Sequence, residues 1–262
     1  MSKGQPLTKK ILAKAAGKEK VETGEFVEAK VDVVMVHDLT GPLTLDAFEK
    51  IRKKKLWDRN KIVVVFDHQI PADRVHSAEL QKRLRKFVRD YKIENFYDVG
   101  RGGICHQLLP EKGYVRPGEV IVGADSHTCT YGAFGAFATG IGSTDAAAVF
   151  ATGTLWFKVP EVMKINVTGI FKKHVFPKDL ILHLIGLLGE EGANYKSLEF
   201  SGPTIKDISI DGRMTLCNMA VEAGAKTGIV EPDEKTFDFL NGRVDKPFTP
   251  VFSDPDAEYE EE

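Results

Sequence analysis

Four short motifs place a histidine beside a carboxylate or another polar group, and each follows an apolar run. They are His37-Asp38, Asp67-His68, His106 and Asp125-Ser126-His127. Histidine titrates near neutral pH and carboxylates orient its ring, so this set suits proton transfer to and from a small polar substrate. It would also suit one metal ion held by two histidines and a carboxylate. Histidines that share no site are the third alternative.

The adjacent pair Asp67 and His68 sets a condition on the local backbone. Successive residues of a strand point to opposite faces, so these two side chains can share a site only where the chain has left strand geometry. Pro71 follows soon after in the sequence and disfavours regular structure just before it. We therefore expect the preceding strand to end before Asp67.

Apolar runs ahead of the motifs predict the elements that position them. The expected strands span residues 30–36, 61–66, 95–99 and 120–122, and the expected helices span 7–16, 44–56 and 73–92. The uninterrupted run from Ile62 to Phe66 is typical of a central strand buried on both faces. The alternation predicts an α/β fold, layered α/β/α, with a mainly parallel sheet. Such sheets bind ligands at the carboxyl ends of their strands, so we expect the motifs to share one rim.

The pattern changes after Pro160. We expect strands at 162–167, 198–200 and 208–210 and helices at 177–189 and 211–229. These elements suggest a first domain over 1–160, carrying most of the histidine and aspartate motifs, and a smaller α/β domain over 161–252. Residues 253–262 are rich in Asp and Glu and read as an acidic connector or a disordered tail.

Composition excludes several kinds of partner. A formal net charge of −2 over 262 residues gives no excess of positive charge that would bind nucleic acid or an anionic membrane. The basic runs at 52–55 and 82–86 are expected to be solvated faces. No leader opens the sequence and no run of about 18 apolar residues occurs, so we expect a cytoplasmic protein. The small-residue segment at 132–157 is expected to be buried packing, with glycines that let backbones approach.

Two glycine motifs fall short of known nucleotide-binding patterns, and the three cysteines show no metal-binding spacing. Gly140-Ile-Gly142 lacks the third glycine of a dinucleotide fingerprint, and the segment from Gly224 to Thr227 lacks the first half of a phosphate loop. The cysteines Cys105, Cys129 and Cys217 form no CxxC pair. Their neighbours are apolar or small, so we interpret them as buried structural thiols, with cluster ligation as the alternative.

Four segments together carry a resemblance to a known family. They are FDHQIPAD at 66–73, GICHQLLPEKGYVRPG at 103–118, DSHT at 125–128 with the small-residue stretch after it, and GRMTLCNMAVEAGAKTGIVEPD at 212–233. In this order they resemble the aconitase family over nearly all of residues 8–262. The resemblance is strongest to large subunits of the two-subunit branch, whose reactions convert isopropylmalate in leucine biosynthesis or homocitrate in the homoaconitase reaction.

The resemblance implies a hydro-lyase that dehydrates and rehydrates a hydroxy-carboxylate through a cis-unsaturated intermediate. It implies a [4Fe-4S] cluster as Lewis acid in the full-length subunit, with its cysteines expected beyond Glu262 and none bound to this chain. It also implies a small subunit that supplies a swivelling domain. This chain alone is therefore expected to be inactive.

The resemblance also implies roles for individual residues. Asp67 and His68 would protonate the departing hydroxyl, His106 would pair with Asp125, and His127 would pair with Glu222. The expected substrate contacts are Ser126, His37 and Thr130, and Asn218 is expected near the cluster. His37 and Thr130 replace a glutamine and an asparagine of single-chain aconitases, which points away from citrate.

Two other functions remain open at the level of sequence. A mononuclear metal hydrolase or lyase would use His106, Asp125 and His127 as ligands. A role in RNA binding is the other alternative, and the near-neutral charge disfavours it.

Overall fold

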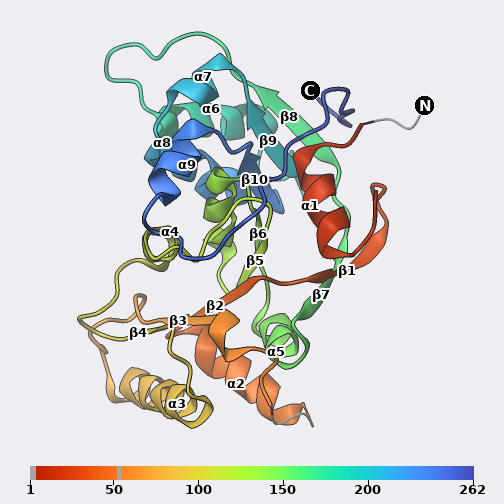
Figure 1. The fold of residues 1–262 in the computed structure, drawn as a ribbon. Helices are drawn as coiled ribbons and strands as arrows, with labels where there is room; N and C mark the ends of the chain where they lie inside the picture. Colours follow the sequence, from red (N-terminus) through yellow and green to blue (C-terminus); the bar gives the residue numbers. More distant parts are fainter. Residues whose placement is uncertain (1–3, 52–54) are drawn as a thin grey trace.

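The computed structural model describes residues 4–51 and 55–262 of the chain (Figure 1). Residues 52–54 of the predicted helix 44–56 and of the basic run at 52–55 lie outside the described residues, and the bounds predicted for this helix were wrong, because the helix spans Thr40–Lys50. Among the described residues, no helix is both long and apolar enough to cross a bilayer.

A five-stranded parallel sheet forms the centre of the molecule, with the strand order β4-β3-β2-β5-β6. Its strands are β2 (Val33–His37), β3 (Ile62–Val65), β4 (Phe96–Tyr97), β5 (Val120–Gly123) and β6 (Phe137–Gly140). The chain builds outward from β2 to β4 and then starts again at β5 on the other side of β2. The order therefore reverses between β2 and β5, which is where open α/β sheets bind ligands.

Alternating side chains of these strands pack against different layers. Val34, Ile62 and Val64 join one core cluster, while Met35 and Val63 join another. The first cluster includes side chains of the helices α2 (Thr40–Lys50), α3 (Val75–Tyr91) and α5 (Ser143–Thr152). The second includes side chains of α4 (Cys105–Glu111), the 3-10 helix η2 (Ser126–Phe134) and α8 (Ile210–Asn218). The predicted layered α/β/α fold is confirmed.

A three-stranded parallel sheet in the order β10-β9-β8 lies beside the first sheet (Figure 1). Its strands are β8 (Val162–Asn166), β9 (Ser197–Ser201) and β10 (Thr227–Val230). The helices that accompany it are α6 (Pro177–Leu188), α7 (Pro203–Asp207), α8, the 3-10 helix η3 (Met219–Ala223) and α9 (Glu234–Leu240).

Two predictions in this region were wrong. The strand expected at 208–210 is a helix start, because the hydroxyl of Ser209 accepts the N–H of Gly212 and caps α8. The helix expected at 211–229 ends early, because Gly224 has a φ of +80° and the chain then enters β10.

The two sheets share a continuous interior. Helix η2, which follows β5, packs against both α8 and β10. At Gly132 the approach is so close that an added Cβ would lie 1.8 Å from the carbonyl oxygen of Gly228. The boundary predicted at residue 160 falls between β7 (Thr154–Lys158) and β8, and the division into two domains stays a prediction.

Described residues near both ends of the chain form defined contacts. Helix α1 (Leu7–Ala15) precedes the antiparallel pair of β1 (Phe26–Lys30) and β7 (Thr154–Lys158). Of the two alternatives for residues 253–262, the disordered tail was wrong, and the acidic connector stays a prediction. Glu260 accepts the N–H of Val162 and pairs with Lys9, and Asp254 pairs with Lys10. The acids of the tail therefore find lysines and backbone donors on α1 and β8, which composition cannot reveal.

Candidate active site

The carboxylate of Asp125 is the centre of the histidine constellation. Its Oδ1 accepts the ring Nε2–H of His106 at 2.8 Å and the backbone N–H of His127 at 2.8 Å. Its Oδ2 faces the Nε2 atoms of His68 at 3.3 Å and His37 at 3.5 Å. The four motifs predicted to share a rim therefore meet at one carboxylate.

The strand order explains this convergence. His37 ends β2 and Asp125 follows β5, so the two residues lie at the carboxyl ends of the neighbouring strands where the order reverses. Asp67 and His68 follow β3, and His106 lies on α4, which follows β4. Parallel strands bring such segments to one edge of the sheet.

Asp38 holds the loop that carries Asp67 and His68. Its two carboxylate oxygens accept the backbone N–H groups of Asp67, His68 and Gln69 at 3.0, 2.9 and 2.8 Å. The strand has already ended at Val65, so the expectation that Asp67 lies outside strand geometry is confirmed. Sequence reasoning missed this role, because a carboxylate that binds backbone amides has no partner side chain to reveal it.

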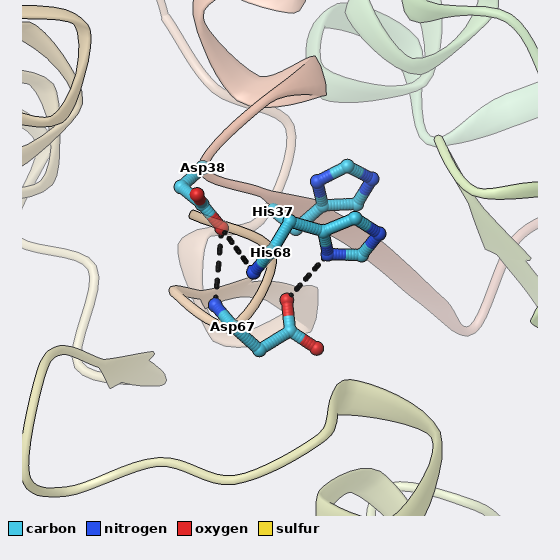
Figure 2. Close-up of side chains that lie close together, drawn as sticks. All are labelled: His37, Asp38, Asp67 and His68. Carbon is cyan, nitrogen blue, oxygen red and sulfur yellow. Dashed lines mark hydrogen bonds and ion pairs between the residues drawn. The ribbon is translucent and has the colours of Figure 1, made fainter. Parts of the chain in front are cut away.

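Asp67 and His68 form a hydrogen-bonded pair (Figure 2). The Nδ1 of His68 lies 2.8 Å from Oδ1 of Asp67, whose Oδ2 accepts the N–H of Cys105 at 2.6 Å. The Asp67 side chain is 6% exposed and that of His68 is 32% exposed. His68 is therefore the member of the pair that solvent or a substrate can reach.

His106 is held from both sides of its ring. While Nε2 donates to Asp125, Nδ1 lies 3.2 Å from the hydroxyl of Tyr131. That hydroxyl also lies 3.4 Å from the carbonyl oxygen of Cys105. Tyr131 can donate to either acceptor, so it can accommodate both the neutral and the charged form of His106. Sequence reasoning did not single out Tyr131, although it lies three residues after the DSHT motif.

His127 and Glu222 bring the second sheet's helices to the site. The His127 Nε2 lies 3.2 Å from Oε1 of Glu222, the pairing expected from the resemblance, and its Nδ1 lies 3.1 Å from the hydroxyl of Ser126. All three residues reach the surface of the site. The functional roles of this pair and of Ser126 stay predictions.

Thr130 and Asn218 lie behind the rim. The Thr130 hydroxyl donates to the carbonyl oxygen of His127 at 2.7 Å and accepts from the Asn218 amide at 2.8 Å. Thr130 is only 2% exposed. Its predicted substrate contact is untested, and its burial favours support of the His127 backbone instead.

Burial and neighbouring charges set the protonation of the site. Burial raises the pKa of Asp125, but hydrogen bonding and the charge of His106 outweigh it and hold that pKa well below its usual range. Burial, followed by the charge of His68, lowers the pKa of His37 to about 4. For His68, burial is outweighed by the Asp67 hydrogen bond and the nearby carboxylates, so its pKa is raised.

Four of the described residues bring potential metal-binding atoms within 4.8 Å of one another: His37, Asp38, Asp67 and His68. Most of these atoms are already engaged. Both Asp38 oxygens accept backbone N–H groups, and the His37 Nδ1 accepts the N–H of Leu39. The contacts therefore describe a hydrogen-bonded loop, and we do not assign a metal to it. The metal hydrolase alternative would use His106, Asp125 and His127 as ligands. In the structure the ring of His106 is hydrogen-bonded to Asp125, and the ring of His127 is hydrogen-bonded to Glu222.

The surroundings of the three cysteines disfavour iron–sulfur ligation. All three are buried, and the Cys129 thiol donates toward the carbonyl oxygens of Ser126 and Asn218. Burial raises the pKa of Cys129 to about 12 and raises the pKa of the Cys105 and Cys217 thiols as well. Iron ligation needs thiolates, which these surroundings oppose.

A parallel α/β sheet with histidine and aspartate side chains gathered at its switch point defines the class of protein, and comparison with known sequences then gives the family. A sequence profile of the aconitase family (aconitate hydratase) matches residues 9–261, so the chain belongs to the aconitase family.

Curated relatives are similar over most of this chain. It is 56% identical over 251 residues to a probable 3-isopropylmalate dehydratase large subunit of Methanothermobacter thermautotrophicus, covering 96% of this chain and 60% of the relative. It is 55% identical over 259 residues to 3-isopropylmalate dehydratase large subunit 1 of Methanopyrus kandleri, covering 99% and 62%. It is 58% identical over 231 residues to a probable methanogen homoaconitase large subunit of Methanosarcina mazei, covering 88% and 59%. The chain thus spans about 60% of the length of these relatives.

Proposed function

We propose that this chain supplies the acid–base half of a hydro-lyase active site that dehydrates and rehydrates 3-isopropylmalate and 2-isopropylmalate. The observation that carries the proposal is the convergence of three histidine rings on the Asp125 carboxylate. The names of the relatives support the reaction class, since several are called 3-isopropylmalate dehydratase large subunits.

Removal of a hydroxyl next to a carboxylate-bearing carbon needs a proton donor, because hydroxide is a poor leaving group. In this proposal His68 donates that proton, and Asp67 holds its ring through the 2.8 Å hydrogen bond. The departing hydroxyl leaves as water, and the proton lost from the neighbouring carbon goes to a base that we place in the separate swivelling domain. His106, held by Asp125 and Tyr131, orients the Asp125 carboxylate. Ser126 and His127 lie where a substrate carboxylate could accept hydrogen bonds.

Members of the aconitase family typically use a [4Fe-4S] cluster. The buried thiols of this chain do not fit that group, so we place its ligands in polypeptide outside this chain. The swivelling domain and its small subunit are likewise proposed as partners, because the relatives are named as large subunits. The chain's own contribution is then proton transfer and substrate orientation.

The homoaconitase reaction on homocitrate and homoisocitrate is the second candidate. It is favoured by relatives of equal similarity that carry that name, one of them 58% identical to this chain. We propose that the separate subunit chooses between an isopropyl and a carboxyalkyl substituent.

The test joins this chain to the part of the Methanothermobacter relative that has no counterpart here and adds the small subunit. After anaerobic cluster loading, isopropylmalate and homocitrate are offered and the unsaturated intermediate is followed by its absorbance. We expect turnover of isopropylmalate and a loss of about a hundredfold or more in Asp125→Asn.

The matched control is Asp145→Asn, which changes an exposed carboxylate on α5 and should leave the rate within about twofold. Equal rates in Asp125→Asn and the parent, or no turnover of either substrate with a fully loaded cluster, would refute the proposal.

A further inference from the structure

His37 lies beneath His68 at the centre of the site. It is the last residue of β2, and its side chain is 4% exposed against 32% for His68. The two rings are stacked, with planes 5° from parallel and centroids 3.7 Å apart (Figure 2). A bound molecule would meet the ring of His68, with His37 behind it.

The hydrogen bonds of His37 determine which nitrogen carries its proton. The backbone N–H of Leu39 lies 3.3 Å from Nδ1 and can only donate, so Nδ1 must accept. The proton of a neutral ring is then on Nε2, which faces Oδ2 of Asp125 at 3.5 Å. A proton on Nδ1 would break the Leu39 contact and leave that amide without its partner.

The stacked rings of His37 and His68 can carry only one positive charge between them. Two imidazolium rings at 3.7 Å would repel each other strongly in a partly buried site. The charged or titratable groups that face His37 are His68 and Asp67 from the loop after β3, Asp125 after β5, and Asp38 beside it in the chain. Asp67 accepts from His68 and not from His37, so the carboxylates favour charge on His68.

We propose that His37 is a positioning residue: a neutral ring, protonated on Nε2, that fixes the plane of His68 and leaves the positive charge to it. The two rings also share Oδ2 of Asp125 as an acceptor, which fixes their relative rotation. This role rests on the proposed function, in which His68 donates a proton. It replaces the substrate contact expected for His37, because burial keeps its ring from the substrate.

The first test is nuclear magnetic resonance of the 262-residue chain, which needs no activity. Long-range ¹H–¹⁵N spectra of the histidine rings are recorded from about pH 5.5 to about pH 8, the range in which histidines ordinarily titrate. Signals are assigned with His37→Gln and His68→Gln, and His76→Gln serves as the control for an exposed ring on α3. We expect His37 to keep the pattern of a ring protonated on Nε2 throughout, while His68 gains a proton as the pH falls. Titration of His37 in this range, or a proton on its Nδ1, would overturn the assignment.

The second test measures kcat and KM separately in the completed enzyme. His37→Ala removes the stack and should lower kcat about tenfold or more, since small displacements of a reacting group are costly. Its KM should stay within about twofold of the parent. His37→Phe keeps a flat ring against His68 and should recover part of kcat.

Ser126→Ala provides the comparison, because an exposed predicted substrate contact should raise KM instead. A rise in KM for His37→Ala as large as that for Ser126→Ala would show direct substrate contact and refute the positioning role. If the unmodified completed enzyme has no activity, the proposed function fails, and the spectra still decide the role of His37.

Discussion

Asp125 and Asp38 are two aspartates of the same site, and each holds a different part of it. Asp125 accepts from histidine rings, whereas Asp38 accepts from three backbone amides of the 67–69 loop. Burial alone would raise the pKa of both groups, and hydrogen bonding outweighs it in both. The sequence motifs marked both aspartates because histidines stand beside them, but the amide-binding role of Asp38 gave no signal because backbone amides belong to every residue.

Replacing Asp38 with asparagine should destabilise the protein and loosen the Asp67–His68 pair. One carboxamide oxygen cannot replace two carboxylate oxygens, so we expect a loss of about 1–3 kcal/mol in the free energy of unfolding. The Asp38 pKa is lowered on folding, so its contribution is present above the unfolded value and is lost as pH falls through the folded value. Urea unfolding at neutral pH and near pH 3 should show a difference that shrinks on acidification. Asp90→Asn, an exposed carboxylate on α3, should change stability by less than about 0.5 kcal/mol.

Glu199 is a buried carboxylate on β9, away from the rim, and should make stability depend on pH in the opposite sense. Burial raises its pKa to about 7, and its Oε1 accepts the N–H of Thr8. A raised folded pKa contributes stability below the unfolded value of about 4.5 that is lost as pH rises through about 7. In Glu199→Gln the amide oxygen still accepts from Thr8, but the side chain no longer titrates. The free energy of unfolding should therefore depend less on pH between about pH 5 and about pH 9. Above about pH 7 the variant should be more stable than the parent by up to about 3 kcal/mol. Thermal unfolding across this range measures the effect, and an unchanged slope would contradict it.

At the scale of elements, strands ahead of the motifs were predictable because each is a short apolar run. The sequence could not show that residues 227–230 return to β structure, because two glycines and a lysine obscure the run there. Nor could it show Ser209 as a helix cap, since the alternation of Ile208 and Ile210 imitates a strand. These elements depend on η2, which fills the space between the two sheets.

The contact between η2 and β10 should therefore be sensitive to a single methyl group. A Cβ at Gly132 would overlap the backbone of Gly228, so Gly132→Ala should lower the free energy of unfolding by at least about 2 kcal/mol. Gly186→Ala is the matched control on α6, where an added Cβ meets nothing within 4 Å. That change should be neutral or stabilising by up to about 1 kcal/mol, because alanine favours helix. Chemical denaturation of both variants checks the pair, and equal effects would argue against tight packing at Gly132.

At the scale of the whole molecule, one edge of one sheet gathers the histidine and aspartate side chains, and the helices beside the second sheet add Glu222 and Asn218. The sequence predicted this gathering, since parallel strands must place their carboxyl ends together. The solvent exposure of each residue was not predictable. Ser126 and Thr130 are near neighbours in the sequence, yet Ser126 is exposed and Thr130 is buried. Exposure depends on what η2 and α8 cover, which is a property of the assembled fold.

The burial of the three cysteines in this fold predicts whether the chain alone can take up an iron–sulfur cluster. Its three thiols are buried and their pKa values are raised, so anaerobic incubation of the 262-residue chain with iron and sulfide should not give a stoichiometric [4Fe-4S] cluster. Iron and sulfide analysis with visible absorbance measures this, and the triple Cys→Ser variant gives the background of adventitious iron. The form completed with the remaining part of the Methanothermobacter relative should bind the cluster under identical conditions. A full cluster on the chain alone, lost in the triple variant, would make Cys105, Cys129 and Cys217 ligands and would require the segments around η2 to open, because no described thiol is exposed in the present fold.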